Sequence, residues 1–379
     1  MKLMEKDPIL KTLKSSLMYL PVPYNINLFW NYGSLLALYL VIQLITGIIL
    51  SMHYCPNIYY AFDSIIHIMK DVKFGWLIRL IHMNGASMYF ILMYIHLGRG
   101  IYYNSFKFHI VWYIGVATFL LSMATAFLGY VLPWGQMSFW GATVITNLLS
   151  ALPYIGQTLV EWVWGGFSIN NATLNRFYTF HFLAPLMIVV LVFIHLVYLH
   201  STGSNNQLGT NSDYLKVSFH PYYSYKDIVW ILVTLTIHFM IIMQMPYYLG
   251  DPDNFIPANP MSTPEHIKPE WYFLFAYSIL RAIPNKLGGV LMLFLSILIL
   301  LILPTTSKLF KIKTSMFYPL SQITFWMFAN TFIILTWLGG QLIEYPYTEL
   351  SQFFTIMYFM YFLITPPLNK YWDKLMFYY

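Results

Sequence analysis

The sequence of 379 residues has little charge and almost no cysteine. Asp, Glu, Lys and Arg together make up 9% of it, against about 25% in a typical soluble protein. So few charged side chains cannot cover the surface of a water-soluble protein of this size, which excludes an ordinary soluble domain and a disordered chain. Because Cys55 is the only cysteine, a secreted protein built on disulfides is excluded as well.

The chain is instead rich in apolar side chains, at 59% apolar and 20% aromatic residues. A helix that crosses the hydrocarbon core of a membrane needs about 20 mostly apolar residues. Eight segments meet this requirement: 31–52, 75–103, 110–132, 174–201, 226–246, 287–308, 319–340 and 346–368. Because the runs are continuous and do not alternate, membrane-spanning strands are disfavoured. The sequence therefore predicts an all-α polytopic membrane protein with eight transmembrane helices.

The basic residues indicate how these helices are oriented. One side of the membrane receives 13 of the 20 Lys and Arg residues, namely Lys2, Lys6, Lys11, Lys14, Arg99, Lys107, Lys216, Lys226, Lys308, Lys311, Lys313, Lys370 and Lys374. The other side receives the remaining 7, namely Lys70, Lys73, Arg79, Arg176, Lys268, Arg281 and Lys286. The positive-inside rule then places both termini on the inner side. The excess of positive charge lies in short loops beside the spans. This placement fits a protein surrounded by membrane lipid and does not indicate nucleic-acid binding.

Two connections on the outer side are too long to be simple turns. The first covers residues 133–173 and the second follows the fifth span, with six prolines between Pro246 and Pro269. Both are expected to contain short interfacial helices. The resulting organisation is an N-terminal bundle over 1–210 and a C-terminal region over 211–379.

Four histidines lie at matched depths in the second and fourth spans. His82 and His96 are 14 residues apart, and so are His181 and His195. Fourteen residues turn a helix through about 40° less than four full turns, so each pair lies on one face about 21 Å apart. The two spans run in the same direction. His82 should therefore lie level with His181, and His96 with His195.

Two stacked imidazole pairs suggest axial ligands for two haem groups. A single histidine in a membrane helix is more often a hydrogen-bonded packing residue, and a proton-relaying transporter or channel is the alternative class of function. Zinc is disfavoured because each level offers only two nitrogens. With one cysteine and no C-x-x-C-H, a covalent c-type haem is excluded. The first four spans are thus predicted to form a di-haem four-helix bundle for electron transfer.

Glycines repeat the same 14-residue spacing in the first and third spans, as Gly33 with Gly47 and Gly115 with Gly129. A flat macrocycle needs neighbouring helices without side chains where it passes, although small residues also serve ordinary helix packing. Arg79 and Arg99 lie three residues from His82 and His96. Each is placed to meet a haem propionate or to extend to the membrane interface as a snorkelling side chain.

Polar residues near both membrane surfaces suggest two further sites. On the inner side, His200, Ser204, Lys226 and Asp227 could bind a quinone and move its protons, or form a solvated loop cluster. On the outer side, Glu270 follows Pro269 in an apolar setting. It could accept a proton beside a quinol pocket or cap a helix.

The chain resembles the mitochondrial cytochrome b family in its animal form, over nearly its whole length. The matching stretches are Trp30–Ser34, His82–Ser87, Gly129–Ile145, Thr202–Asn206, Gly250–Asn254 and Lys268–Tyr272. The resemblance implies the central subunit of ubiquinol–cytochrome c reductase, a homodimeric complex of the inner mitochondrial membrane. Its partners there would be the Rieske iron–sulfur protein, cytochrome c1 and the other bc1 subunits, and its termini would face the matrix.

The resemblance also implies roles for single residues. His82 and His181 would hold the low-potential haem b near the intermembrane space, and His96 and His195 the high-potential haem b near the matrix. The outer site would oxidise ubiquinol and the inner site would reduce quinone, in a Q cycle coupled to proton translocation. The outer set would be Phe127, Gly141, Glu270 and Tyr277, and the inner set His200, Ser204, Lys226 and Asp227.

Small departures from the family pattern affect only loops. Asn104 stands where the family commonly has Gly, and Leu342 and Tyr345 replace a Pro and a His. The competing interpretation is another membrane di-haem protein, such as the cytochrome b anchor of a hydrogenase or dehydrogenase. Those anchors have fewer spans and lack a second quinone site.

Overall fold

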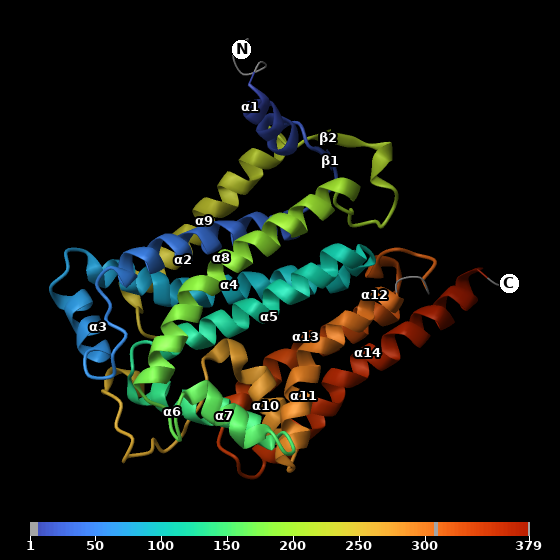
Figure 1. The fold of residues 1–379 in the computed structure, drawn as a ribbon. Coiled ribbons are helices and arrows are strands. Elements are labelled where there is room, and N and C mark those ends of the chain that lie inside the picture. The colour runs from blue at the N-terminus through green and yellow to red at the C-terminus, as the bar shows by residue number, and fades with distance from the viewer. Residues whose placement is uncertain (1–6, 307–309, 378–379) are drawn as a thin grey trace.

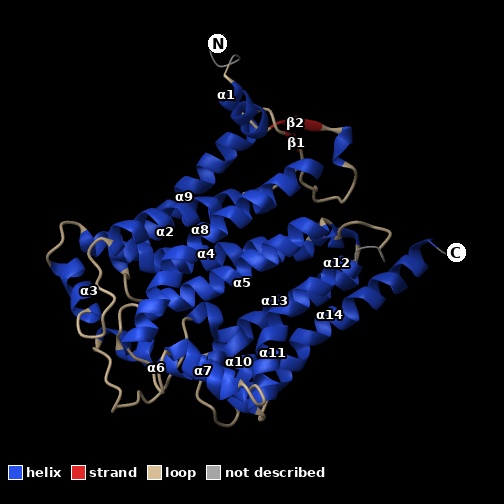
Figure 2. Cartoon of the chain, in the orientation of Figure 1, coloured by secondary structure: helices blue, strands red, loops and turns tan. Residues whose placement is uncertain are grey.

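The computed structural model describes residues 7–306 and 310–377, and this part of the chain is mostly helical (Figure 2). Lys2, Lys6 and Lys308 of the inner charge count lie outside these residues. The first five long helices are α2 (Tyr32–Ser51), α4 (Gly75–Tyr102), α5 (His109–Val131), α8 (Asn171–Thr202) and α9 (Tyr222–Gln244). They are followed by α11 (Lys286–Leu298), η8 (Ile299–Ile302), α12 (Leu303–Thr306), α13 (Pro319–Gly339) and α14 (Tyr347–Phe377).

These helices occupy all eight predicted spans, with α11, η8 and α12 together forming the sixth. Six of the eight are long and apolar enough to cross a membrane by length and composition. The other two, α4 and α14, have 28 and 31 residues and are more polar, α4 because it carries histidines and arginines. The prediction of an all-α polytopic membrane protein is confirmed.

Short elements cap the two ends of the long helices (Figure 1). At one end lie α1 (Pro8–Leu13), the π-helix η1 (Lys14–Met18), and strands β1 (Pro21–Pro23) and β2 (Lys216–Ser218). The strands pair antiparallel, with Val22 opposite Val217. At the other end lie α3 (Ala61–Lys70), α6 (Gln136–Asn147), η4 (Leu148–Ala151), α7 (Gly156–Trp164), η6 (Pro252–Phe255), η7 (Trp271–Phe273) and α10 (Leu274–Ala282). Both long outer connections thus contain short helices, as predicted.

The packing joins two groups of helices. In the N-terminal group α2 packs along α4 and α5 along α8, and in the C-terminal group α10 packs against α13 and α14. Fully buried side chains such as Tyr39, Phe90 and Leu335 belong to one apolar core that runs through both groups. Many apolar side chains of α8 and α9 point outward, as expected of helices whose surroundings are also apolar.

The loop after α4 explains one departure from the family pattern. Asn104 has a φ of 53°, a left-handed conformation that glycine adopts freely and that asparagine tolerates better than other residues. It precedes the short helix η3 (Ser105–Lys107), and its side-chain oxygen accepts a hydrogen bond from Ser315 in η10 (Ser315–Phe317) at 3.3 Å. Asparagine therefore suits a position where the family commonly has glycine.

Candidate functional site

The outer histidine pair lies between α4 and α8. The ring centroids of His82 and His181 are 6.3 Å apart and the rings are perpendicular, at 88°. This separation accommodates a metal with two metal–nitrogen bonds of about 2 Å each. The two residues that the spacing placed at one level are therefore in contact range across the bundle.

Hydrogen bonds fix the outer histidines in one tautomer. The Thr46 hydroxyl donates to the Ile42 carbonyl at 2.6 Å, so toward His82 Nδ1, at 2.9 Å, it can only accept. His181 Nδ1 donates to the Thr125 carbonyl at 2.8 Å, since a carbonyl has no proton to give. With the proton on Nδ1 in both rings, the Nε2 lone pairs are left free for a metal.

The inner pair is oriented differently. His195 Nδ1 faces the backbone carbonyl of Val111, without ideal hydrogen-bond geometry. His96 lies close enough to His195 to interact electrostatically, and its Nδ1 is 3.3 Å from a guanidinium nitrogen of Arg99. That guanidinium also lies over the Trp30 ring, 5.5 Å from its centroid.

Each of the four glycines lies against one of the four histidines. A Cβ added at Gly33 would be 3.5 Å from His96 Cε1, at Gly47 3.1 Å from His82 Cε1, and at Gly115 3.4 Å from His195 Cε1. A Cβ at Gly129 would overlap His181 Cε1 and lie 2.7 Å from Nδ1 of the same ring, inside van der Waals contact. The 14-residue spacing that the glycines share with the histidines thus corresponds to four separate glycine–histidine contacts in the fold.

Neither arginine of α4 has an anionic partner in the described part of the chain. Within residues 7–306 and 310–377 neither Arg79 nor Arg99 forms an ion pair with a carboxylate, and the buried Nε of Arg99 has no hydrogen-bond partner. A buried guanidinium without a counter-charge is costly unless an anion binds there. The donor set at each level, two imidazoles with a neighbouring arginine, therefore fits a haem with its propionates.

The outer pocket gathers every residue expected there. One cavity is lined by Phe127 of α5, Gly141 of α6, Glu270 just before η7, and Tyr277 of α10, together with Tyr130, Val144, Ile145, Ile267, Pro269 and Phe273. A Cβ at Gly141 would meet no atom within 4 Å, so this glycine leaves space open. The Tyr277 hydroxyl donates to the Ile267 carbonyl at 3.2 Å, which joins the wall of the pocket to the segment before Glu270.

Glu270 places a carboxyl group in this pocket. Burial raises the pKa of its carboxyl to about 7, and the nearby Asp251 adds to the rise. Tyr130 and Lys268 lower this pKa, and Lys268 also forms an ion pair with Asp251 at 3.3 Å. The Tyr130 phenol lies beside the carboxyl without a well-formed hydrogen bond. A carboxyl with a pKa near neutrality can accept and release a proton under working conditions.

The inner polar residues are only partly brought together. Asp227 accepts hydrogen bonds from Asn31 Nδ2 at 2.5 Å and from Ser34 Oγ at 2.8 Å, while Lys226 Nζ donates to the Ile26 carbonyl at 2.8 Å. His200 lies half-buried in the last turns of α8, and Ser204 follows Gly203, whose φ is 76°. Among the hydrogen bonds of the described residues, neither His200 nor Ser204 is a partner of Asp227.

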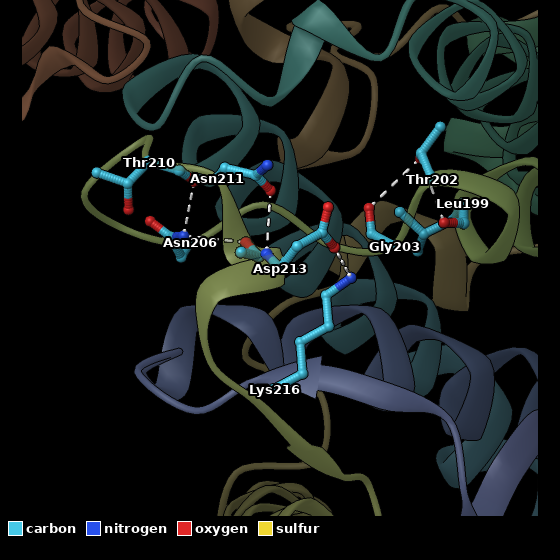
Figure 3. Close-up of polar contacts among 9 residues, drawn as sticks. Leu199, Thr202, Gly203, Asn206, Thr210, Asn211, Asp213 and Lys216 are labelled. Carbon is cyan, nitrogen blue, oxygen red and sulfur yellow. Dashed lines mark hydrogen bonds and ion pairs between the residues drawn. The ribbon is translucent and has the colours of Figure 1, made fainter.

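The loop that continues from Ser204 is held by its own polar contacts (Figure 3). Asn206 donates to the Thr210 carbonyl at 2.9 Å, and Lys216 pairs with Asp213 at 2.6 Å.

Several residues of these sites were not singled out from the sequence. Thr46 contacts the outer histidine, Asn31 and Ser34 hold Asp227, and Tyr130 lies beside Glu270. Thr46 is three residues from Gln43, whose amide donates to the His82 carbonyl at 2.9 Å. A polar pair inside an apolar span was the available signal for these two, since buried polar groups need partners.

A bundle of membrane helices that holds two stacked histidine pairs defines a membrane-embedded redox protein. Comparisons with known proteins specify the family. The family model described as Cytochrome b/b6/petB matches residues 17–203, and that of Cytochrome b(C-terminal)/b6/petD matches residues 257–359. A cytochrome b of Apis mellifera ligustica is 60% identical over 375 residues, which cover 99% of this chain and 97% of that protein.

A solved structure agrees with these relatives. A chain of a hyperthermophilic respiratory complex III superposes with a TM-score of 0.90 at 32% identity, covering 97% of this chain and 98% of that one. The chain therefore belongs to the cytochrome b family, as a cytochrome b of respiratory complex III. Membership of this family implies haem b binding, a place in a redox enzyme of the respiratory chain, and bc1 complex partners.

Proposed function

We propose that this chain oxidises ubiquinol at its outer pocket and reduces a quinone at its inner polar cluster. This would make it the catalytic subunit of the mitochondrial bc1 complex, coupling electron transfer from ubiquinol to cytochrome c to proton translocation in a Q cycle. The observation that best supports this proposal is that each of four histidines lies against its own glycine, at two levels between α2, α4, α5 and α8.

We infer which residues hold the cofactors. His82 with His181, and His96 with His195, would each hold one non-covalent haem b, low-potential and high-potential respectively. When bound, these two groups supply a one-electron path between the outer and inner sites. Thr46 and the Thr125 carbonyl keep the outer rings in the tautomer that presents Nε2. Arg79 and Arg99 offer their guanidinium groups to the propionates, which supports the assignment because neither has a carboxylate partner among the described residues.

At the outer pocket, Glu270 accepts a proton from ubiquinol. Its raised pKa supports this role, because a carboxyl with a pKa near 7 takes up a proton without holding it too tightly to release. Phe127, Gly141 and Tyr277 shape the apolar cavity around the ring of the quinol. Of the two electrons of the quinol, one would go to the Rieske iron–sulfur protein and the other toward the inner site.

At the inner cluster, Asp227 and His200 supply protons to the quinone. Asn31 and Ser34 hold the Asp227 carboxylate by two hydrogen bonds, while Lys226 and Ser204 lie in the adjoining segments.

The setting of the chain follows the same proposal. The bc1 complex would be a homodimer in the inner mitochondrial membrane that includes cytochrome c1 and further subunits. Both termini would face the matrix, because the basic residues concentrate on that side. Residues 1–210 would form the haem-binding bundle and 211–379 the C-terminal region.

The test is haem content together with quinol-dependent electron transfer. The purified complex should give a reduced-minus-oxidised spectrum of haem b, and pyridine haemochrome analysis should find two non-covalent haems for each copy of this chain. Ubiquinol should reduce cytochrome c. A colourless protein would favour a proton-relaying transporter, and a haem protein with no activity toward quinol would contradict the assigned reaction.

A further inference from the structure

Helix α4 contacts the turn that follows Glu270 through two hydrogen bonds and one pair of stacked rings. The Trp271 indole nitrogen donates to Ser87 Oγ at 3.0 Å, and the Tyr94 hydroxyl donates to the Tyr272 carbonyl. Between these two bonds the Phe90 ring stacks on the Tyr272 ring, with centroids 4.3 Å apart and planes 7° apart. Three side chains of one helix thus contact the two residues next to Glu270.

The spacing of the three side chains explains why they act together. Ser87, Phe90 and Tyr94 are separated by three and four residues, so they lie on one face of α4. Ser87 and Phe90 are buried, as is Tyr272 on the other side of the contact. A buried carbonyl or indole N–H that loses its hydrogen-bond partner destabilises the fold, because no water replaces the partner as it would at the surface.

The turn itself is short and leaves Glu270 little freedom. The Phe273 amide donates to the Glu270 carbonyl at 2.9 Å, closing η7 directly after Glu270. Any shift of Trp271 or Tyr272 is therefore passed to the backbone that carries the carboxyl. The same α4 carries His82 and His96, so the contact joins the turn directly to the helix of these two histidines.

We propose that Ser87, Phe90 and Tyr94 are positioning residues that fix the Glu270 carboxyl in the outer pocket. This inference rests on the proposed function and deepens it. None of the three side chains lines the cavity; they act on the turn beneath it. A displacement of about 1 Å at a reacting group can lower a rate by roughly a hundredfold.

The charged and titratable groups that face the Glu270 carboxyl come from its own segment and from α5. They are Tyr130, Asp251, Lys268 and Tyr272. Because burial is the main cause of the raised pKa of Glu270, a loosened turn that admits water should lower that pKa while Tyr130, Asp251 and Lys268 stay in place. The pH profile of quinol oxidation therefore reports the position of the turn.

The experiment compares two hydroxyl deletions in the assembled complex. Tyr94→Phe removes the bond to the Tyr272 carbonyl. Tyr39→Phe is the matched control, because the Tyr39 hydroxyl also donates from a buried position to a backbone carbonyl, that of Thr234 at 3.1 Å, which belongs to α9 and not to the turn after Glu270. Ser87→Ala removes the acceptor for Trp271, and Ser87→Thr keeps a hydroxyl there.

We expect Tyr94→Phe and Ser87→Ala to lower kcat by roughly tenfold or more, with a smaller change in KM. The acid limb of their rate–pH profile for quinol oxidation should move to lower pH, while their haem spectrum stays unchanged. Tyr39→Phe and Ser87→Thr should keep the wild-type rate and pH profile. Should the Tyr94→Phe complex not assemble, Ser87→Ala decides alone.

Two results would overturn the inference. One is a wild-type pH profile and rate in both Tyr94→Phe and Ser87→Ala. The other is an equal change in Tyr39→Phe, which would reveal a general loss of packing. Failure of the proposed function is seen separately, since the wild-type complex itself would then lack haem or quinol oxidation.

Discussion

Replacing single glycines by alanine should separate the outer haem site from the inner one. At Gly129 an added Cβ would be 2.7 Å from His181 Nδ1, whereas comfortable contact between heavy atoms begins at about 3.5 Å. Because Cε1 of the same ring lies closer still, the imidazole would have to move by more than roughly 0.8 Å, which exceeds the tolerance of a metal–nitrogen bond of about 2 Å. We therefore expect Gly129→Ala to lose the outer haem.

The matched control lies on the same helix. At Gly115 the added Cβ would be 3.4 Å from His195 Cε1, which is nearly ordinary contact. Overpacking at Gly129 should lower stability by about 1–3 kcal/mol. At Gly115 there is little overpacking, and alanine in a helix interior is more stable than glycine by about 1 kcal/mol. Gly115→Ala should therefore be close to neutral and keep both haems.

The assay is haem stoichiometry with the reduced-minus-oxidised spectrum of each purified variant. Wild type and Gly115→Ala should contain two haems per chain and Gly129→Ala one. Gly47→Ala should be intermediate, since its Cβ would lie 3.1 Å from His82 Cε1. Two intact haems in Gly129→Ala, or equal loss in Gly115→Ala, would refute the reasoning, because the fold distinguishes the sites only through these contacts.

Three further perturbations test other parts of the site. His96→Ala should remove the inner haem and leave the outer one, so that quinol oxidation no longer reduces a haem at the inner level; normal inner-haem reduction, followed by optical spectroscopy, would contradict the pairing of levels. Quinol oxidation should rise with pH through about 7, because the carboxyl of Glu270 has its pKa raised to about 7 by burial and must be deprotonated to accept a proton. Glu270→Gln should lack this limb in a rate–pH profile, and a profile unchanged by the substitution would argue against Glu270 as the acceptor. Asn104→Ala should lower stability by about 1 kcal/mol, because a residue with a φ of 53° that is neither glycine nor asparagine is strained; thermal unfolding of the purified complex measures this, with Asn104→Gly as the control that should unfold close to wild type.

Much of the architecture follows from local sequence patterns. Long apolar runs have few alternatives to helices in a membrane, because every backbone polar group must be satisfied within the segment. The equal spacing of His82 with His96 and of His181 with His195 likewise follows from helix geometry alone. The outer residues could be placed in one pocket only through the family resemblance, since Phe127, Gly141 and Tyr277 have no distinguishing local signal.

The sequence by itself determined the class of protein, the eight spans, the matched histidine levels and the family. The tertiary structure decided what each side chain contacts, because hydrogen-bond partners such as Thr46 for His82, Asn31 for Asp227 and Tyr94 for Tyr272 come from segments distant in the chain. It also distinguished four glycines of identical spacing by how closely each approaches its histidine. Spacing along one helix fixes a level and a face, whereas the distance between two helices depends on the packing of all their side chains.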